Sequence, residues 1–160
     1  NAVKLRSAIK NSFDDATIDS RLNSNEEVLA IFNFLQEMVG SLSDKFKNRI
    51  ELETPFNIEE MPKIKIDRAV LLDALRKILA GMFKFDEKAI LRISLITDHM
   101  NQLVMIFYLD SAVKTGLANS LDSEQISKVL DSQNCRFEVV ETRENTAVLV
   151  VPSHRIIDAK

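Results

Sequence analysis

The sequence has few of the residues on which several classes of protein depend. Its 160 residues include one cysteine, Cys135, which excludes an internal disulfide and a cysteine-rich zinc site and is compatible with a reducing compartment. The two histidines, His99 and His154, lie far apart with no metal-ligand spacing around them, so we expect no metal site. We interpret Cys135 as a small buried hydrophobic residue and His99 as a solvated turn residue.

The sequence also lacks a strong excess of positive or negative charge, and it lacks long apolar runs. The formal net charge is −3 without a basic stripe to neutralise phosphates, so nucleic-acid binding is not expected. No apolar run approaches the roughly 20 residues of a membrane-spanning helix, and residues 1–15 lack the apolar region of a signal peptide. We therefore expect a cytoplasmic domain without direct membrane contact. The first residue is not methionine, so we expect a fragment of a longer protein.

What is present describes an ordinary globular domain. The apolar fraction of 46% and the charged fraction of 28% are unlike those of disordered or fibrous chains. The length fits one domain, and a chain of this size can bury a hydrophobic core without disulfide bonds or metal ions to hold it together. We therefore look for a single pattern of helices and strands.

Residues 1–20 are predicted to form a helix with an uneven apolar stripe, made of Val3, Ile9, Phe13 and Ile18. No partner for this stripe is evident in the rest of the sequence. The stripe is either a surface for something outside this chain or the frayed end of a fragment.

Two further helices are predicted from apolar residues at helical spacing. One begins at Asn23 or Ser24 and runs to Phe46, with Glu26 and Glu27 in its first turn, where the helix dipole favours anions. The other covers residues 68–84 with Asp67 as its cap. In addition to these two, a shorter helix is predicted from a cap at Ser123 to about Gln133.

Strands are predicted where apolar and polar residues alternate between turn signals. They cover residues 49–54, 64–66, 89–97, 102–110, 136–140 and 146–151. Residues 98–101 form a hairpin turn, residues 111–122 a loop, and residues 153–160 a polar tail. This element order predicts an α+β fold, a two-layer sandwich whose mixed, mostly antiparallel sheet is covered by helices on one face.

Short stretches in series resemble the catalytic ATP-binding domain of sensor histidine kinases, which shares an ATPase superfamily with gyrase and the MutL repair proteins. The matching stretches are residues 25–29, 47–52, 61–67, 71–85, 106–110, 126–139 and 146–152. The resemblance implies an ATPase-like domain over residues 21–152. It also implies that residues 1–20 are the end of an upstream dimerisation hairpin.

The resemblance implies a degenerate nucleotide site on the helix over residues 68–84. Lys77 and Gly81 stand where the family's N-box asparagines bind Mg²⁺ and phosphate. Mg²⁺ needs oxygen ligands, which neither residue supplies, so the usual Mg-ATP complex is not expected. Gly81 alternatively marks a close approach of another element. Lys84 matches the N-box lysine and is either a phosphate contact or a solvated residue at the helix end.

The remaining nucleotide motifs are eroded as well. Asp110 stands where the family's carboxylate accepts from the adenine amino group, although an aspartate at a strand end also commonly caps a turn. The first glycine box, residues 111–114, has no glycine. The segment that forms the family's lid over ATP, together with the second glycine box, is reduced to about a dozen residues. Gly116 is a remnant of that glycine box. We expect no catalytic residue and no cofactor, while weak, magnesium-independent ATP or ADP binding stays open.

Three functions follow as hypotheses. The leading one is a pseudokinase-like interaction module in two-component signalling, whose partner is a response-regulator receiver domain or the helical hairpin of a histidine kinase. The second is a divergent but active ATP-dependent histidine kinase domain. The third is a regulatory domain of the same superfamily outside phosphorelay. Neither His99 nor His154 lies on an upstream helix as a phosphoacceptor would.

Overall fold

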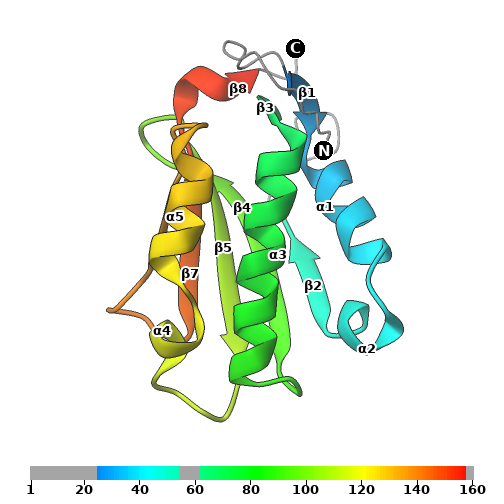
Figure 1. The fold of residues 1–160 in the computed structure, drawn as a ribbon, viewed down its shortest axis with the longest axis vertical. Helices are drawn as coiled ribbons and strands as arrows, with labels where there is room; N and C mark the ends of the chain where they lie inside the picture. The colour runs from blue at the N-terminus through cyan, green and yellow to red at the C-terminus, as the bar shows by residue number, and fades with distance from the viewer. Residues whose placement is uncertain (1–24, 55–61, 158–160) are drawn as a thin grey trace, which may run out of the picture.

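The computed structural model describes residues 25–54 and 62–157, so the helix predicted over residues 1–20 lies outside the described residues. Helices cover one face of a five-stranded sheet, and a smaller sheet lies at one end (Figure 1). In chain order the elements are β1 (Glu26–Ala30), α1 (Ile31–Gly40), α2 (Asp44–Lys47), β2 (Ile50–Glu53), β3 (Lys63–Asp67), α3 (Arg68–Phe85), β4 (Ile90–Thr97), β5 (Leu103–Asp110), α4 (Leu117–Ser120), α5 (Ser123–Asp131), β6 (Arg136–Val139), β7 (Thr146–Val151), a 3₁₀ turn η4 (Ser153–Arg155) and β8 (Ile156–Ile157).

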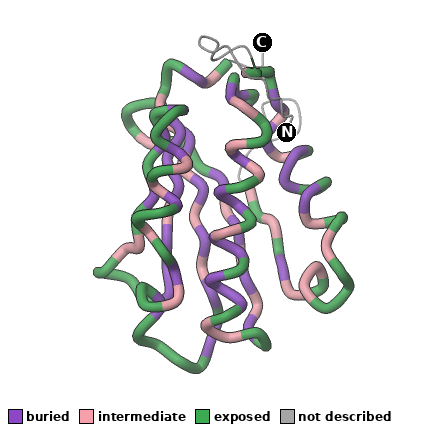
Figure 2. The backbone as a smooth tube through the Cα atoms, in the orientation of Figure 1, coloured by how far each residue is buried: buried purple, intermediate pink, exposed green. Residues whose placement is uncertain are grey.

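The larger sheet has the strand order β2-β4-β5-β7-β6. Strands β2 and β4 are parallel, whereas the other neighbours are antiparallel. Alternate residues of β5, such as Phe107 and Leu109, are fully buried beneath the helices, and buried positions follow the inner faces of α3 and α5 (Figure 2). The predicted α+β two-layer sandwich with a mixed, mostly antiparallel sheet is therefore confirmed.

The strongest local signals also predicted their elements correctly. Helix α3 begins after Asp67, whose carboxylate accepts from the backbone N–H groups of Ala69 and Val70. The hairpin of β4 and β5 turns at residues 98–101, where exposed His99 lies. The described residues contain no helix that is long and apolar enough to cross a membrane.

The smaller sheet, with the order β1-β3-β8, was not predicted. The prediction of a helix through Glu26 and Glu27 is wrong, because residues 26–30 form β1 and the helix begins only at Ile31. Buried Leu29 pairs with Ile64 of β3. This pairing lies far along the chain, so local apolar spacing does not reveal it.

Smaller corrections concern helix ends and the C-terminal region. The helix expected to reach Phe46 ends at Gly40 and is followed by the separate turn α2. Asp122 rather than Ser123 caps α5 by accepting from the Gln125 backbone N–H. The loop over residues 111–122 contains α4, and the expected polar tail folds back to pair β8 with β3.

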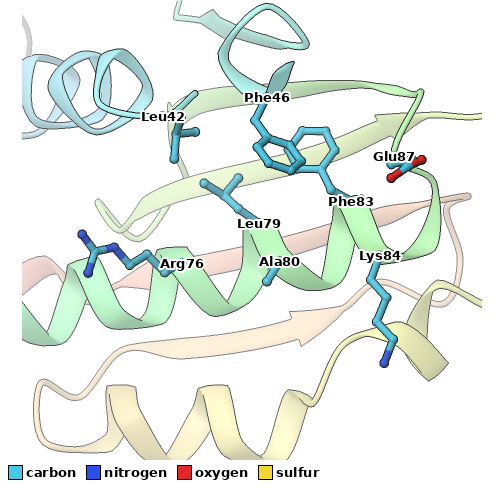
Figure 3. A pocket seen from close by; sticks show the side chains of 8 residues that line it. All are labelled: Leu42, Phe46, Arg76, Leu79, Ala80, Phe83, Lys84 and Glu87. Atoms are coloured by element: carbon cyan, nitrogen blue, oxygen red, sulfur yellow. The ribbon is translucent and has the colours of Figure 1, made fainter. Parts of the chain in front are cut away.

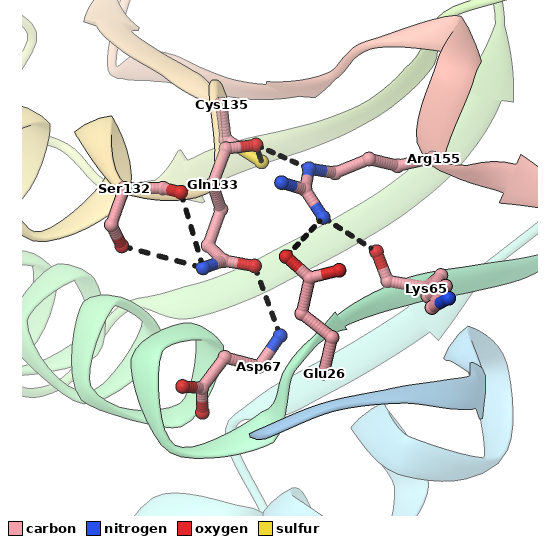
Figure 4. A network of polar contacts seen from close by, with 7 residues as sticks. All are labelled: Glu26, Lys65, Asp67, Ser132, Gln133, Cys135 and Arg155. Atoms are coloured by element: carbon pink, nitrogen blue, oxygen red, sulfur yellow. Dashed lines mark hydrogen bonds and ion pairs between the residues drawn. The ribbon is translucent and has the colours of Figure 1, made fainter. Parts of the chain in front are cut away.

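Arg155 joins the two ends of the described chain (Figure 4). Its side chain is only 10% exposed, and Nη1 forms an ion pair with Glu26 at 3.2 Å and donates to the Lys65 carbonyl at 2.9 Å. Its Nε donates to the carbonyl of Gln133, whose side chain in turn accepts from the Asp67 N–H at 3.0 Å. A single buried guanidinium thus connects β1, β3, the end of α5 and the start of α3.

Helix α3 and the segment before α5 approach each other at Gly81. A Cβ atom at this position would overlap Leu121 Cδ2 and would lie 2.8 Å from the Ser120 carbonyl oxygen. Both approaches are too close for any side chain, so the interpretation of Gly81 as a point of close approach is confirmed. Cys135 is likewise buried as predicted, and desolvation raises the pKa of its thiol to about 11.

Replacing Arg155 with methionine should destabilise the fold by about 3 kcal/mol, because removing one partner of a buried ion pair leaves the other charge uncompensated. Urea unfolding followed by circular dichroism measures the change. The matched control is Arg136→Met, whose side chain is 61% exposed in its pair with Glu138, and we expect less than about 1 kcal/mol there. Equal effects of the two substitutions would contradict the role given to Arg155.

Replacing Gly81 with alanine should destabilise by about 1–3 kcal/mol through overpacking, although alanine is intrinsically the better helix former. The same substitution at Gly40, where nothing lies within 4 Å of the place that the new methyl group would take, should be neutral or stabilising. Thermal unfolding of the two variants beside the parent compares them directly. A stable Gly81→Ala protein would show that the contact with Leu121 is not tight.

Candidate functional site

One cavity brings together three of the residues that the sequence singled out. Lys77, Gly81 and Lys84 lie along one flank of α3 and line a cavity of about 220 Å³ between α3 and the segment Ser120–Ile126. The three share a flank because they are four and three residues apart on one helix. We call this space the α3–α5 cavity. Its opposite wall includes Ser120, Asp122 and Gln125.

The charges of the α3–α5 cavity are only partly paired. Lys77 forms an ion pair with Asp73 one turn earlier on α3, at 2.8 Å. Lys84 has no ion-pair partner among the described residues, and its side chain extends from α3 away from Phe46, toward the side of α4 and α5 (Figure 3). Asp122 is committed to capping α5. The arrangement offers ammonium groups to an anion but places a carboxylate in the same space.

No metal centre forms around these residues. Within the part of the chain that the structure describes, no three His, Cys, Asp or Glu side chains gather closely enough to hold a metal ion. Asp122 is the single carboxylate of the α3–α5 cavity, and Mg²⁺ is bound through oxygen ligands. The residues present therefore do not fit a protein-held magnesium ion.

Asp110 lies elsewhere. It ends β5 with a half-exposed side chain and pairs with Arg92 of β4 at 3.5 Å. Arg92 is also bound by Glu51 of β2 at 3.1 Å, and that hydrogen bond raises the pKa of its guanidinium. Because the neighbouring Leu109 is buried under the helices, alternation places Asp110 on the opposite, open face of the sheet. The structure does not bring it together with Lys84, and its adenine contact stays a prediction.

Ser111 is the residue that faces inward at this strand end, and the sequence reasoning missed it. It is buried, and its hydroxyl donates to the Asp86 carboxylate at 2.6 Å while accepting from the Val113 N–H at 3.0 Å. The hydrogen bond from Ser111, followed by one from the Lys88 backbone, lowers the pKa of Asp86. The alternation of β5 continued by one residue would have shown that Ser111 points inward.

Gly116 belongs to a second cavity, of about 380 Å³, between residues 114–118 and the turn over residues 139–145. Its φ of +98°, at the start of α4, is a conformation that glycine adopts readily. Asn145 closes this region by donating from Nδ2 to the Val113 carbonyl at 2.8 Å. Gly116 and Lys84 therefore line different cavities.

A third hollow lies on the other flank of α3 and was not predicted (Figure 3). It has a volume of about 380 Å³ and is walled by Leu42 and Phe46 on one side and by Leu79 and Phe83 of α3 on the other. The rings of Phe46 and Phe83 lie 5.3 Å apart between centroids. We call this hollow the α2–α3 groove.

Comparison with known proteins finds similarity in fold alone. No family model matches the chain, and no curated protein matches it by sequence. The nucleotide-free catalytic domain of histidine kinase ThkA superposes with a TM-score of 0.61 at 12% identity, covering 80% of this chain and 95% of that one. A mycobacterial sensor histidine kinase, MprB, gives 0.57 at 10% identity over 79% of this chain and 97% of its own.

A third match is ThkA in complex with the response regulator TrrA, with a TM-score of 0.60, 11% identity, and coverage of 80% of this chain and 42% of that one. These likenesses agree with the mostly antiparallel five-stranded sheet and its helices. The chain therefore has the ATP-binding fold of the catalytic domains of sensor histidine kinases, as the resemblance in its sequence predicted.

Proposed function

We propose that this chain is a non-catalytic domain of histidine-kinase ATPase type that acts in two-component signalling by binding another protein. The observation that carries the proposal is the contact at Gly81. The segment that follows the position of the family's first glycine box packs directly on α3, with Leu121 and the Ser120 carbonyl against the glycine. The flank of α3 that matches the family's N-box is thereby covered by the chain itself.

The space that remains is small for a nucleotide. Ligand pockets commonly hold about 300–1,000 Å³, whereas the α3–α5 cavity holds about 220 Å³. Its wall is not a detached lid, because α5 contributes Ile126 and Leu130, which are 1% and 0% exposed, to the core. The site also has no oxygen set for Mg²⁺, and Asp110 pairs with Arg92 on the other face of the sheet. These features disfavour phosphoryl transfer by this domain.

The proposed partner is a response-regulator receiver domain or the helical hairpin of a histidine kinase. The choice rests on the fold and on the similar kinase ThkA, which is seen in complex with a response regulator. In this proposal the domain positions its partner, and no bond is made or broken within it.

A second candidate function is nucleotide binding by a divergent, active kinase domain. It is favoured by one observation: Lys84 has no ion-pair partner in the described chain and borders the α3–α5 cavity beside Lys77. Two ammonium groups on one helix flank would attract a phosphate chain. Such binding would not depend on magnesium, given the residues present.

Calorimetric titration of the full chain with ADP and with a non-hydrolysable ATP analogue, each with and without Mg²⁺, separates the two candidates. We expect no magnesium-dependent heat, and any binding to be weaker than about 100 μM, which corresponds to about 5.5 kcal/mol. Magnesium-dependent binding tighter than that limit would overturn the non-catalytic proposal.

The variant Lys84→Ala tests where any weak nucleotide binding occurs. If ADP binds in the α3–α5 cavity, loss of this ammonium group should weaken the affinity severalfold, because a charge-assisted hydrogen bond to phosphate is lost. Lys128→Ala on α5, an exposed lysine outside the residues that line the cavity, is the matched control and should leave the affinity unchanged. Equal affinities for both variants would place the nucleotide elsewhere.

A further inference from the structure

The α2–α3 groove leaves apolar surface open to water along α3. Leu79 and Phe83 of α3 form one wall, and half-buried Leu42 and Phe46 form the facing wall (Figure 3). Leu42 and Phe46 pack against the core and still keep part of their apolar surface in contact with solvent. A partner that covers this surface gains the free energy of its burial.

The charged groups around the groove leave an excess of positive charge on α3. Arg76, Lys84 and Glu87 line the groove. Lys45 holds the carboxylate of Glu87 at 3.5 Å, so this pair is already neutral. Neither Arg76 nor Lys84 has an ion-pair partner in the part of the chain that the structure describes. An occupant that complements the groove therefore carries negative charge beside its apolar surface.

Arg76, Ala80 and Lys84 form one ridge of α3, because they follow one another at intervals of four residues. All three are exposed, and Ala80 leaves a notch between two long side chains. The rise of the helix places Arg76 and Lys84 about 12 Å apart along α3. The Lys84 side chain points toward α4 and α5 (Figure 3), but its flexible stem lets the ammonium group turn to either side of the ridge. Carboxylates about seven or eight residues apart on a second helix have the same spacing.

The walls of the groove favour a helix over a strand as the occupant. A strand that adds to a protein needs free backbone N–H and C=O groups along a sheet edge. The groove is lined instead by α3 and by the connection from α1 to β2, which contains the turn α2. A helix satisfies its own backbone hydrogen bonds, and the notch at Ala80 lets its side chains interlock with the ridge of α3.

We infer that the α2–α3 groove binds an acidic amphipathic helix of a partner protein. The helix lies along α3, with its apolar stripe against Leu42, Phe46 and Phe83 and a carboxylate at Arg76. Three turns of helix, about 16 Å, span the ridge from Arg76 to Lys84. The inference rests on the proposed function, since it takes another protein as the ligand, and it assigns that ligand a surface and a chemical character.

Fluorescence anisotropy with the full chain and a labelled helical peptide tests the inference. The acidic peptide is a capped helix of Ala and Gln with Leu at alternating intervals of three and four residues, and with two Glu seven residues apart beside the Leu stripe. We expect a dissociation constant below about 1 mM. Two further peptides serve as controls, one with the same residues shuffled so that the Leu no longer share a face, and one with Lys in place of Glu. Each should bind at least about fivefold more weakly.

A charge swap in the protein gives the decisive comparison. Arg76→Glu should weaken binding of the acidic peptide at least about fivefold and strengthen binding of the Lys peptide by a similar factor, because the ion pair is rebuilt with opposite signs. Arg143→Glu is the matched control with the same change in net charge. Arg143 is exposed in the turn between β6 and β7 and lies outside the groove, so both affinities should stay unchanged.

Several outcomes would overturn the inference. They are no binding of the acidic peptide, equal affinities for the ordered and shuffled peptides, and an effect of Arg76→Glu that the Lys peptide does not reverse. Self-association of the chain in sedimentation equilibrium that Arg76→Glu abolishes would assign the groove to a second copy instead. None of these measurements includes a nucleotide, so their failure leaves the calorimetric test of the proposed function unaffected. Magnesium-dependent nucleotide binding would overturn that function without changing the affinity for the acidic peptide.

Discussion

The contact of Gly81 with the Ser120 carbonyl oxygen and the Leu121 side chain is the constraint on which the arrangement of this domain depends. It brings α3 and the start of α5 as close as two chains can approach, since any Cβ at Gly81 would overlap Leu121. That distance sets where α5 lies on the sheet, and the end of α5 then places Gln133 against the N–H of Asp67. The carbonyl of Gln133 in turn accepts from Arg155, which joins the end of α5 to the small sheet through Glu26 and Lys65. A local steric condition in one helix is thus connected to the far end of the fold.

Helix α3 serves three purposes with its three sides. The inward side, with residues such as Leu75 and Ile78 that are 0% exposed, forms the core. Lys77 and Gly81 border the α3–α5 cavity, and Leu79 and Phe83 wall the apolar α2–α3 groove. Ala80 and Lys84 line both hollows, and the groove is the larger and more apolar of the two.

Sequence reasoning succeeded where the determining interactions are local. Asp67 capping and apolar spacing define α3, and alternation with a polar turn defines the β4–β5 hairpin. The family resemblance assigned Lys77, Gly81 and Lys84 to this helix, and the structure brings them to one cavity. Sequence reasoning failed for β1, because the partners of Glu26 lie far along the chain. Glu26 is opposite Asp67 in the strand register and forms an ion pair with Arg155. Sequence reasoning also did not show which face of the sheet Asp110 occupies, because the order of motifs does not state on which face of a strand a residue lies.

The energetics of α5 decide what the cover over α3 can do. Admitting a nucleotide against α3 would require the segment from Leu121 to Leu130 to move, exposing Leu121, Ile126 and Leu130, which are now at most 5% exposed. Burying each such side chain stabilises by about 1.5–3 kcal/mol, so their exposure costs about 5–9 kcal/mol. A ligand with a dissociation constant of about 100 μM supplies only about 5.5 kcal/mol. A mobile lid opens because few core contacts hold it. Here the segment that covers α3 contributes Leu121, Ile126 and Leu130 to the hydrophobic core. A nucleotide that binds by displacing the segment Leu121–Leu130 must first overcome a free-energy cost as large as an ordinary binding energy. An anion that binds at Lys84 leaves this segment in place and avoids the cost, but it can contact only the residues that line the α3–α5 cavity.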